Sequence, residues 1–175
     1  MRPALRFLLR GLLVVACVWA NAALAADDDT QWIADERGCK VANPFPQPDE
    51  SITWSGACKD GYAHGEGVLT FLVSGREHSR YTGTLERGWA QGQGVLQFSD
   101  GSKYDGQWSQ SQENGTGRRD WPDGSWYEGG WKNGKPHGLG QFRRPDGKIF
   151  IGEWVDGVYE GDAEDGEERY DPNRT

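Results

Sequence analysis

The sequence predicts an all-β protein built as a row of β-hairpins, and three observations lead to this fold class. A pattern of glycine and aromatic residues recurs every 23 residues. The 175-residue chain contains 26 glycines and 9 tryptophans, yet only 35% of its residues are hydrophobic. Glycine destabilises helix interiors by about 1 kcal/mol relative to alanine, and disordered chains are poor in aromatic residues. The composition therefore argues against both a helical bundle and a disordered chain.

The repeat places aromatic residues and glycines at fixed positions. An aromatic residue stands at position 0, a glycine at position 2 and, in three copies, a tryptophan at position 4. These structural positions are Trp54, Tyr81, Tyr104, Tyr127 and Phe150, then Gly83, Gly106, Gly129 and Gly152, then Trp108, Trp131 and Trp154. Further glycines recur at positions 7, 11 and 13, so the array comprises four full repeats and a partial fifth. Their bounds are 54–80 (with a four-residue insertion), 81–103, 104–126, 127–149 and 150–163.

Each repeat predicts one β-hairpin. Positions 0 to 4 alternate, so the even positions share one face of a strand. The return strand places positions 13, 15 and 17 on one face, as with Gly94, Leu96 and Phe98. An Asp-Gly pair such as Asp100-Gly101 supplies the positive φ that a tight turn needs. Glycines at positions 2 and 13 would let aromatic rings lie across the backbone, so a single layer could bury enough apolar area.

Residues 1–25 have the features of a secretory signal peptide. Three arginines accompany an apolar run at residues 11–20, and residues 23–25 have the small-x-small form of a cleavage site. The apolar run is shorter than the about 20 residues of a membrane-spanning helix. We therefore expect export, with the bacterial periplasm as the compartment. The alternative is a lipoprotein, because residues 14–17 (VVAC) resemble a lipobox that ends at Cys17.

Charge and cysteine content of the exported chain restrict its partners and predict a covalent link. Cleavage after Ala25 would remove three of the 19 basic residues and none of the 27 acids, which leaves a net charge of −11. This charge argues against broad binding to nucleic acid or anionic membrane. Cys39 and Cys58 would remain and predict one disulfide in an oxidising compartment. A metal site is the alternative, but no CxxC motif or nearby histidine completes it.

The segments outside the array are predicted to cover its two ends. Residues 26–53 form an extended N-terminal cap, because prolines alternate between residues 44 and 48 and favour polyproline geometry. The disulfide would fold this cap over the first hairpin, where Trp32 and Phe45 would cover the exposed face. Residues 164–175 form an acidic tail, interpreted as a solvated end that blocks edge pairing rather than as a calcium site.

The pattern YxGxxxxGxxxGxG, at a period of 23 residues, resembles the MORN repeat (membrane occupation and recognition nexus) over residues 54–163. The resemblance implies a row of antiparallel β-hairpins that form an elongated, curved sheet. It also implies a non-catalytic role in protein–protein scaffolding, in dimerisation or in contact with phospholipids, here in an exported bacterial type. Ser111 at position 7 and Ala163 at position 13 depart from the pattern, so the third and fifth copies are expected to be less regular.

Two groups of residues are candidates for binding. Aromatic residues outside the repeat pattern suit a partner protein or a sugar, and these are Tyr62, Trp89 and Trp126. Basic residues concentrated between positions 118 and 148 suggest an anion or lipid-headgroup patch, and these are Arg118, Arg119, Lys132, Lys135, Arg143, Arg144 and Lys148. The alternatives are local packing for the aromatic residues and an ordinary mixed surface for the basic ones.

The sequence favours a binding protein over an enzyme. GxSxG, HExxH and P-loop motifs are absent, and we expect no catalytic residue, metal or cofactor. The leading hypothesis is an exported scaffold that binds a protein partner or a second copy of itself in the cell envelope. The alternative is an envelope-ligand binder that recognises glycan, such as peptidoglycan, or phospholipid headgroups.

Overall fold

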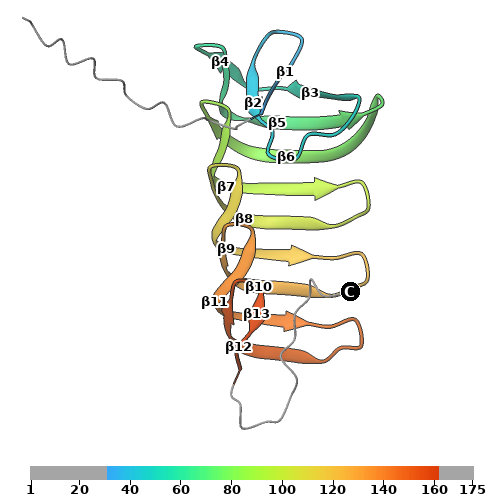
Figure 1. The fold of residues 1–175 in the computed structure, drawn as a ribbon, viewed down its shortest axis with the longest axis vertical. Helices are drawn as coiled ribbons and strands as arrows, with labels where there is room; N and C mark the ends of the chain where they lie inside the picture. Colours follow the sequence, from blue (N-terminus) through green and yellow to red (C-terminus); the bar gives the residue numbers. More distant parts are fainter. Residues whose placement is uncertain (1–30, 162–175) are drawn as a thin grey trace, which may run out of the picture.

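The computed structural model describes residues 31–161, which form one open, curved sheet of thirteen strands (Figure 1). The predicted all-β row of antiparallel hairpins is thereby confirmed. The signal peptide predicted at residues 1–25 and the acidic tail at residues 164–175 lie outside the described residues. Within residues 31–161, no helix is long and apolar enough to cross a membrane.

The strands follow one another along the sheet in nearly sequential order. The long axis of the molecule runs across them, from β5 to β13, and β3 and β4 both pair with β5. Every pairing is antiparallel except the short parallel contact of β2 with β5. The strands are β1 Trp32–Ala34, β2 Lys40–Ala42, β3 Glu50–Trp54, β4 Ala57–Lys59, β5 Tyr62–Val73, β6 Arg76–Glu86, β7 Trp89–Phe98, β8 Lys103–Ser109, β9 Gln112–Asp120, β10 Trp126–Lys132, β11 Lys135–Arg143, β12 Ile149–Val155 and β13 Val158–Tyr159.

Two kinds of turn define the two edges of the sheet. At the Asp-Gly edge, the turn glycines Gly101, Gly124 and Gly147 have the positive φ that the sequence predicted. At the short-turn edge, two-residue turns at 60–61, 87–88, 110–111, 133–134 and 156–157 have positive φ at both residues. Ser111 keeps this conformation with φ 59°, and its Oγ accepts a hydrogen bond from the backbone N–H of Ala90 at 3.0 Å.

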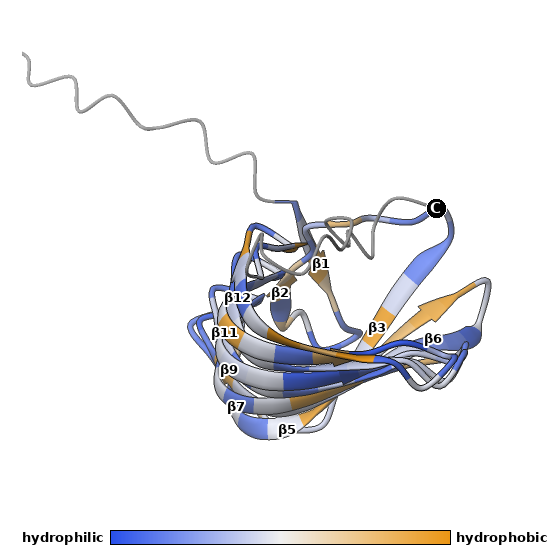
Figure 2. Cartoon of the chain, turned by 90° about the horizontal axis from the view of Figure 1, so that it is seen from below, coloured by the Kyte–Doolittle hydropathy of each residue, from blue (hydrophilic) through white to orange (hydrophobic). Residues whose placement is uncertain are grey.

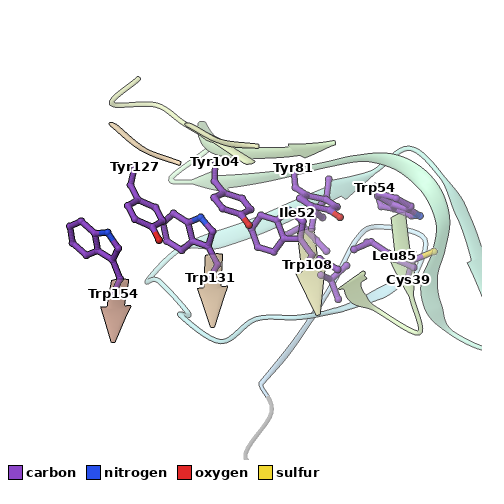
Figure 3. Close-up of a cluster of buried hydrophobic side chains, with 14 of the residues drawn as sticks. Cys39, Ile52, Trp54, Tyr81, Leu85, Tyr104, Trp108, Tyr127, Trp131 and Trp154 are labelled. Carbon is purple, nitrogen blue, oxygen red and sulfur yellow. The ribbon is translucent and has the colours of Figure 1, made fainter. Parts of the chain in front are cut away.

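A row of alternating tyrosine and tryptophan rings forms the core of the array (Figure 3). Tyr104 makes edge-to-face contacts with Trp108 at 5.1 Å and with Trp131 at 5.2 Å between ring centroids. Trp131 then contacts Tyr127 at 5.2 Å, so each tryptophan links two successive repeats. The indole nitrogen of Trp131 donates to the carbonyl of Gly117 in the preceding repeat at 3.0 Å. The rings therefore hold neighbouring hairpins together without a second layer of structure.

Bulges at one place in successive repeats bend the sheet around this ring row. The pairing register shifts between Gly83 and Thr84, between Gly106 and Trp108 and between Gly129 and Trp131. A bulge increases the bend of its strand. Seen along the long axis, the strands overlay as a trough with the first strands, β1 and β2, on its concave side (Figure 2). We call the face with the ring row the inner face and the opposite face the outer face.

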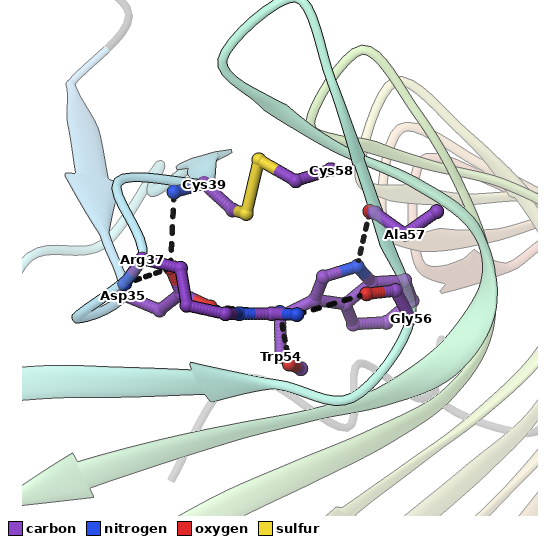
Figure 4. The surroundings of a disulfide bond; sticks show 7 residues. All are labelled: Asp35, Arg37, Cys39, Trp54, Gly56, Ala57 and Cys58. Atoms are coloured by element: carbon purple, nitrogen blue, oxygen red, sulfur yellow. Dashed lines mark hydrogen bonds and ion pairs between the residues drawn. A yellow bond between two sulfur atoms is a disulfide. The ribbon is translucent and has the colours of Figure 1, made fainter.

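The disulfide Cys39–Cys58 attaches the N-terminal cap to β4, as the sequence predicted (Figure 4). The Cys39 side chain is buried in the core, whereas Cys58 is exposed. Around the disulfide, Arg37 forms an ion pair with Asp35 at 2.9 Å and donates to the carbonyl of Trp54. The cap is thus fixed by a covalent bond and by charged hydrogen bonds.

One prediction about the cap is wrong. Phe45 is 80% exposed and covers no hairpin, because the proline-rich segment that carries it loops away from the sheet. Trp32, by contrast, packs against the first two repeats through Tyr62 at 5.1 Å and Trp89 at 5.5 Å. The buried apolar residues of the cap are Cys39, Val41, Ala42 and Ile52 rather than Phe45.

Reduction of the disulfide should destabilise the protein. The bond joins residues 19 positions apart, and a loop of this size corresponds to roughly 3 kcal/mol by the chain-entropy model. Urea unfolding with and without reductant should therefore show a fall of roughly 3 kcal/mol in the free energy of unfolding. A Cys39→Ala/Cys58→Ser variant is the control and should not respond to reductant. Equal stability of the oxidised and reduced wild-type protein would contradict the stapling role.

Candidate binding site

An unbroken column of glycines crosses the sheet from β5 to β12. Each glycine lies opposite the next in the strand register, and the column consists of Gly67, Gly83, Gly94, Gly106, Gly117, Gly129, Gly140 and Gly152. A Cβ atom on any of them would point toward an aromatic ring of the inner face. At Gly94, for example, it would lie 2.5 Å from the ring of Tyr81. The column therefore presents bare backbone to the outer face.

An open groove of about 990 Å3 follows this column over β8 to β12 on the outer face. Its floor is glycine backbone, and its walls are outward-pointing side chains on either side of the column. The wall residues that matter for its chemistry are Asp105, Arg118, Glu128, Gln141, Leu139 and Ile151. Gly130 also lines the groove, and the corresponding position holds Thr84, Gln107 or Glu153 in other repeats.

Charged side chains line the middle of the groove. Arg118 lies opposite both Asp105 and Glu128 in the register of β8, β9 and β10. Its guanidinium forms ion pairs with Asp120 at 2.8 Å and with Glu128 at 3.2 Å. It also stacks 4.3 Å from the ring centroid of Trp126. The arginine of the groove is therefore engaged by two carboxylates and a ring, and the groove carboxylates are themselves paired, Glu128 with Arg118 and Asp105 with Lys103.

Aliphatic side chains mark the C-terminal end of the groove. Leu139 on β11 is 78% exposed, and Ile151 on β12 is 71% exposed. The two residues are diagonal neighbours, because Gln141 pairs with Ile151 and Leu139 pairs with Glu153. Ile149, on the same face of β12 but outside the groove, is 49% exposed. Neighbouring exposed aliphatic residues on a rigid surface are characteristic of interaction sites.

A comparison with protein families assigns the repeats. The model of the MORN repeat matches residues 56–71, 81–103, 104–126, 127–149 and 150–161. The chain belongs to the MORN repeat family. Repeats of this family bind proteins or membrane lipids and are not catalytic units. A search of curated proteins finds no match to the chain.

The MORN array does not bring the three candidate aromatic residues together. Tyr62 and Trp89 lie at the short-turn edge, where both are half-buried against Trp32 of the cap. Trp126 begins β10 at the opposite, Asp-Gly edge, with Arg118 stacked on its ring. The first two therefore contribute to cap packing, and Trp126 lies beside the outer groove.

The seven candidate basic residues also lie in different places on the MORN array. Arg119 is on the inner face, whereas Arg118 is on the outer face. Lys132 and Lys135 flank the turn at the short-turn edge. Near the Asp-Gly edge, Arg143 donates to the carbonyl of Gly124 at 3.0 Å, Arg144 pairs with Asp146 at 3.4 Å, and Lys148 lies 5.0 Å from the ring of Phe150. The structure therefore shows no single basic surface formed by these seven residues.

A buried ion pair interrupts the apolar inner face in the third repeat. Glu113 on β9, which is only 5% exposed, accepts a hydrogen bond from Arg119 at 2.5 Å. The second carboxylate oxygen of Glu113 and the Nε of Arg119 are buried without a hydrogen-bond partner. Burial raises the pKa of Glu113 to about 7, although the positive charge of Arg119 opposes this shift.

The repeat register could have revealed this pair from the sequence. Glu113 occupies position 9, where other copies have Ala63, Ala90, Pro136 and Tyr159. Arg119 occupies position 15, where other copies have Leu69, Leu96 and Phe142. Positions 9 and 15 both face inward. Opposite charges at both of these apolar positions in one repeat therefore indicate that the two side chains pair with each other. Sequence reasoning noted Arg119 only as part of a basic cluster and missed Glu113.

Other polar groups offer no assembled catalytic or metal site within the part of the chain that the structure describes. No group of three or more His, Cys, Asp or Glu residues there is placed to hold a metal ion. His137 borders the groove and lies 3.6 Å from Asp156, whereas His64 is at the other end of the array. Within the described residues, the outer groove is a hollow lined by charged, polar and aliphatic side chains, and we take it as the candidate binding site.

The buried ion pair predicts an unusual pH dependence of stability. Because the pKa of Glu113 is raised from 4.5 to about 7 in the folded protein, the folded state holds this proton more tightly than the unfolded state. The contribution of Glu113 to stability is therefore fully present below pH 4.5 and falls as the pH rises to about 7, by up to about 1.4 kcal/mol per pH unit.

Glu113→Gln isolates this effect from the other titrating groups. The difference in free energy of unfolding between wild type and Glu113→Gln should change steeply between pH 5 and 7. Glu66→Gln, at an exposed position on β5, is the matched substitution outside the buried pair and is measured in parallel. A constant difference for Glu113→Gln would contradict the assigned titration.

Proposed function

We propose that this protein is an exported, non-enzymatic MORN-repeat scaffold that binds a protein partner, or a second copy of itself, through its outer groove in the cell envelope. The observation that carries the proposal is the glycine-floored groove with the exposed aliphatic pair Leu139 and Ile151 at its end. Family membership supports a binding role over a catalytic one. The basic and apolar pattern of residues 1–25 supports export.

The use of the two faces supports this assignment. The rings of the inner face are buried in contacts between repeats, and Tyr104, Tyr127 and Trp154 are fully buried. On the outer face, by contrast, Leu139 and Ile151 remain largely exposed. Because exposed aliphatic residues weaken solubility without adding to the fold, their placement beside a groove favours an interaction surface.

The groove favours a protein over the alternative ligands. Recognition of an anionic headgroup would need a concentration of cations, but the structure distributes the seven candidate basic residues over both faces and both edges. Glycan recognition commonly uses exposed aromatic rings, and none of the residues that line the groove is Trp, Tyr or Phe. A protein segment can use both the polar middle and the aliphatic end.

Site-specific photocrosslinking tests the proposed function. A photoreactive residue at Gln141, in the groove wall, should yield a discrete adduct with a protein partner or a second copy when the full chain is expressed in its own envelope. Leu139→Ser/Ile151→Ser should reduce this adduct by about fivefold or more, because it removes two exposed apolar contacts. Thermal unfolding of the variant checks that the fold is retained.

Two controls distinguish specific binding in the groove from nonspecific crosslinking. Ile149→Ser changes the same residue type on the same face of β12 outside the groove and should leave the adduct unchanged. A photoreactive residue at exposed Lys59, on β4, should not give the Gln141 adduct. Adducts that consist only of lipid or glycan, or that persist in Leu139→Ser/Ile151→Ser, would overturn the proposal.

A further inference from the structure

One outer wall of the groove repeats its chemistry at a fixed spacing. Asp105, Glu128 and Ile151 all occupy position 1 of their repeats and point outward from β8, β10 and β12. The register places them in one row, because each is linked to the next through the strand between them. Successive members are two strands apart, which corresponds to about 9.6 Å. Position 1 of this wall therefore offers acid, acid and aliphatic side chains at equal intervals. The register places Arg118 between the two acids, and Gln141 between Glu128 and Ile151.

This interval matches the pitch of a polyproline-II helix. Such a helix rises 3.1 Å per residue with three residues per turn, so residues i, i+3 and i+6 share one face at intervals of about 9.3 Å. A β-strand places successive side chains of one face only about 6.7 Å apart and would lose register with the wall. Over the two intervals of the row, the mismatch of a polyproline-II segment is only about 0.6 Å.

The charges of Asp105 and Glu128 indicate which residues a bound polyproline-II segment should carry. The carboxylate of Asp105 is 54% exposed and pairs with Lys103 at 3.0 Å, while that of Glu128 is 52% exposed and pairs with Arg118 at 3.2 Å. Exposed pairs of this kind contribute little and exchange easily. Arg118 would retain Asp120 if Glu128 turned to a ligand. Both carboxylates are therefore exposed to solvent, and an incoming cation competes with Lys103 for Asp105 and with Arg118 for Glu128.

We propose that the groove binds a polyproline-II segment of a partner protein with Lys or Arg at positions i and i+3 and Leu or Ile at position i+6. This inference rests on the proposed function and names the partner chemistry for the same site. The two cations contact Asp105 and Glu128, and the aliphatic residue packs between Leu139 and Ile151. The side-chain-free floor of Gly106, Gly129 and Gly152 lets a stiff segment lie close to the sheet. A preformed helix loses little conformational entropy on binding.

Synthetic peptides test this inference with the full chain. The matched probes are fluorescently labelled Lys-Pro-Pro-Lys-Pro-Pro-Leu and its reverse, Leu-Pro-Pro-Lys-Pro-Pro-Lys, since the direction of binding is open. The spacing control is Lys-Pro-Lys-Pro-Pro-Leu-Pro, which has the same composition. The charge control replaces both lysines of the matched probe by glutamate. Fluorescence anisotropy should show about tenfold tighter binding of one matched probe than of either control, with an affinity that falls as salt rises.

Variants locate the binding in the groove. Asp105→Asn/Glu128→Gln should weaken the matched probe by about tenfold and remove most of its salt dependence. Leu139→Ser/Ile151→Ser should weaken it by about fivefold or more. Glu66→Gln, on the outer face of β5, and Ile149→Ser are the matched controls and should bind as wild type does.

The outcomes distinguish this inference from the proposed function. Equal affinity for the matched probes and the spacing control, or no loss in Asp105→Asn/Glu128→Gln, overturns the polyproline-II inference. Absence of binding to every probe also overturns it, while a Gln141 photoadduct that depends on Leu139 and Ile151 would leave the protein-binding function standing. If Ile149→Ser also abolishes the photoadduct, the adduct does not depend specifically on the groove, and the proposed function is overturned.

Discussion

The contact between one aromatic ring and two glycines is the constraint on which the rest of the structure depends. In the second repeat, Tyr81 lies over Gly83 and Gly94, and Tyr104 and Tyr127 repeat this contact in the next two repeats. A buried ring of this size corresponds to roughly 4–6 kcal/mol of apolar burial. Because the ring packs on backbone, the hairpin needs no second layer of secondary structure. The low hydrophobic content of the chain is therefore compatible with a stable fold.

The same contact restricts the residues of the inner face but not those of the outer face. Glycine is required in the column because a Cβ there would point inward and collide with a ring, whereas the outer side of these inward-facing positions is backbone because side chains alternate along a strand. The floor of the outer groove is therefore the outer side of the same positions that pack against the rings. The walls of the groove are free to vary from repeat to repeat, which allows acidic residues in β8 and β10 and an aliphatic residue in β12. In this account, stability is assigned to the inner face and recognition to the outer face.

Much of the fold could be predicted from the sequence because its period is strict. The spacing of 23 residues predicted the hairpins, the Asp-Gly turns and the rings over glycine, and the cysteine count predicted Cys39–Cys58. Phe45 was misplaced because neither prolines nor a nearby disulfide determine which way a loop side chain points. The basic residues were grouped by proximity along the chain, but each hairpin returns the chain to the other edge and alternation divides neighbours such as Arg118 and Arg119 between faces.

The groove and the Glu113–Arg119 pair lay beyond the prediction for a different reason. The groove depends on which outward side chains the pairing of neighbouring strands places side by side, and the bulges after Gly83, Gly106 and Gly129 shift that pairing within each hairpin. Glu113 and Arg119 both lie on β9, so their contact depends on the path of that one strand. A comparison of apolar positions between copies would have found Glu113. The groove additionally required the exposure of Leu139 and Ile151, which alternation alone does not decide.

A double-mutant cycle between Tyr81 and Gly94 tests the central claim most directly. The three atoms nearest to a Cβ at Gly94 all belong to Tyr81. Gly94→Ala should lower the free energy of unfolding by about 2 kcal/mol in the wild-type protein, because overpacking of this kind strains the site. In a Tyr81→Leu background the same substitution should have an effect of less than about 0.5 kcal/mol, since the colliding ring is gone. An equal effect of Gly94→Ala in both backgrounds would contradict the account.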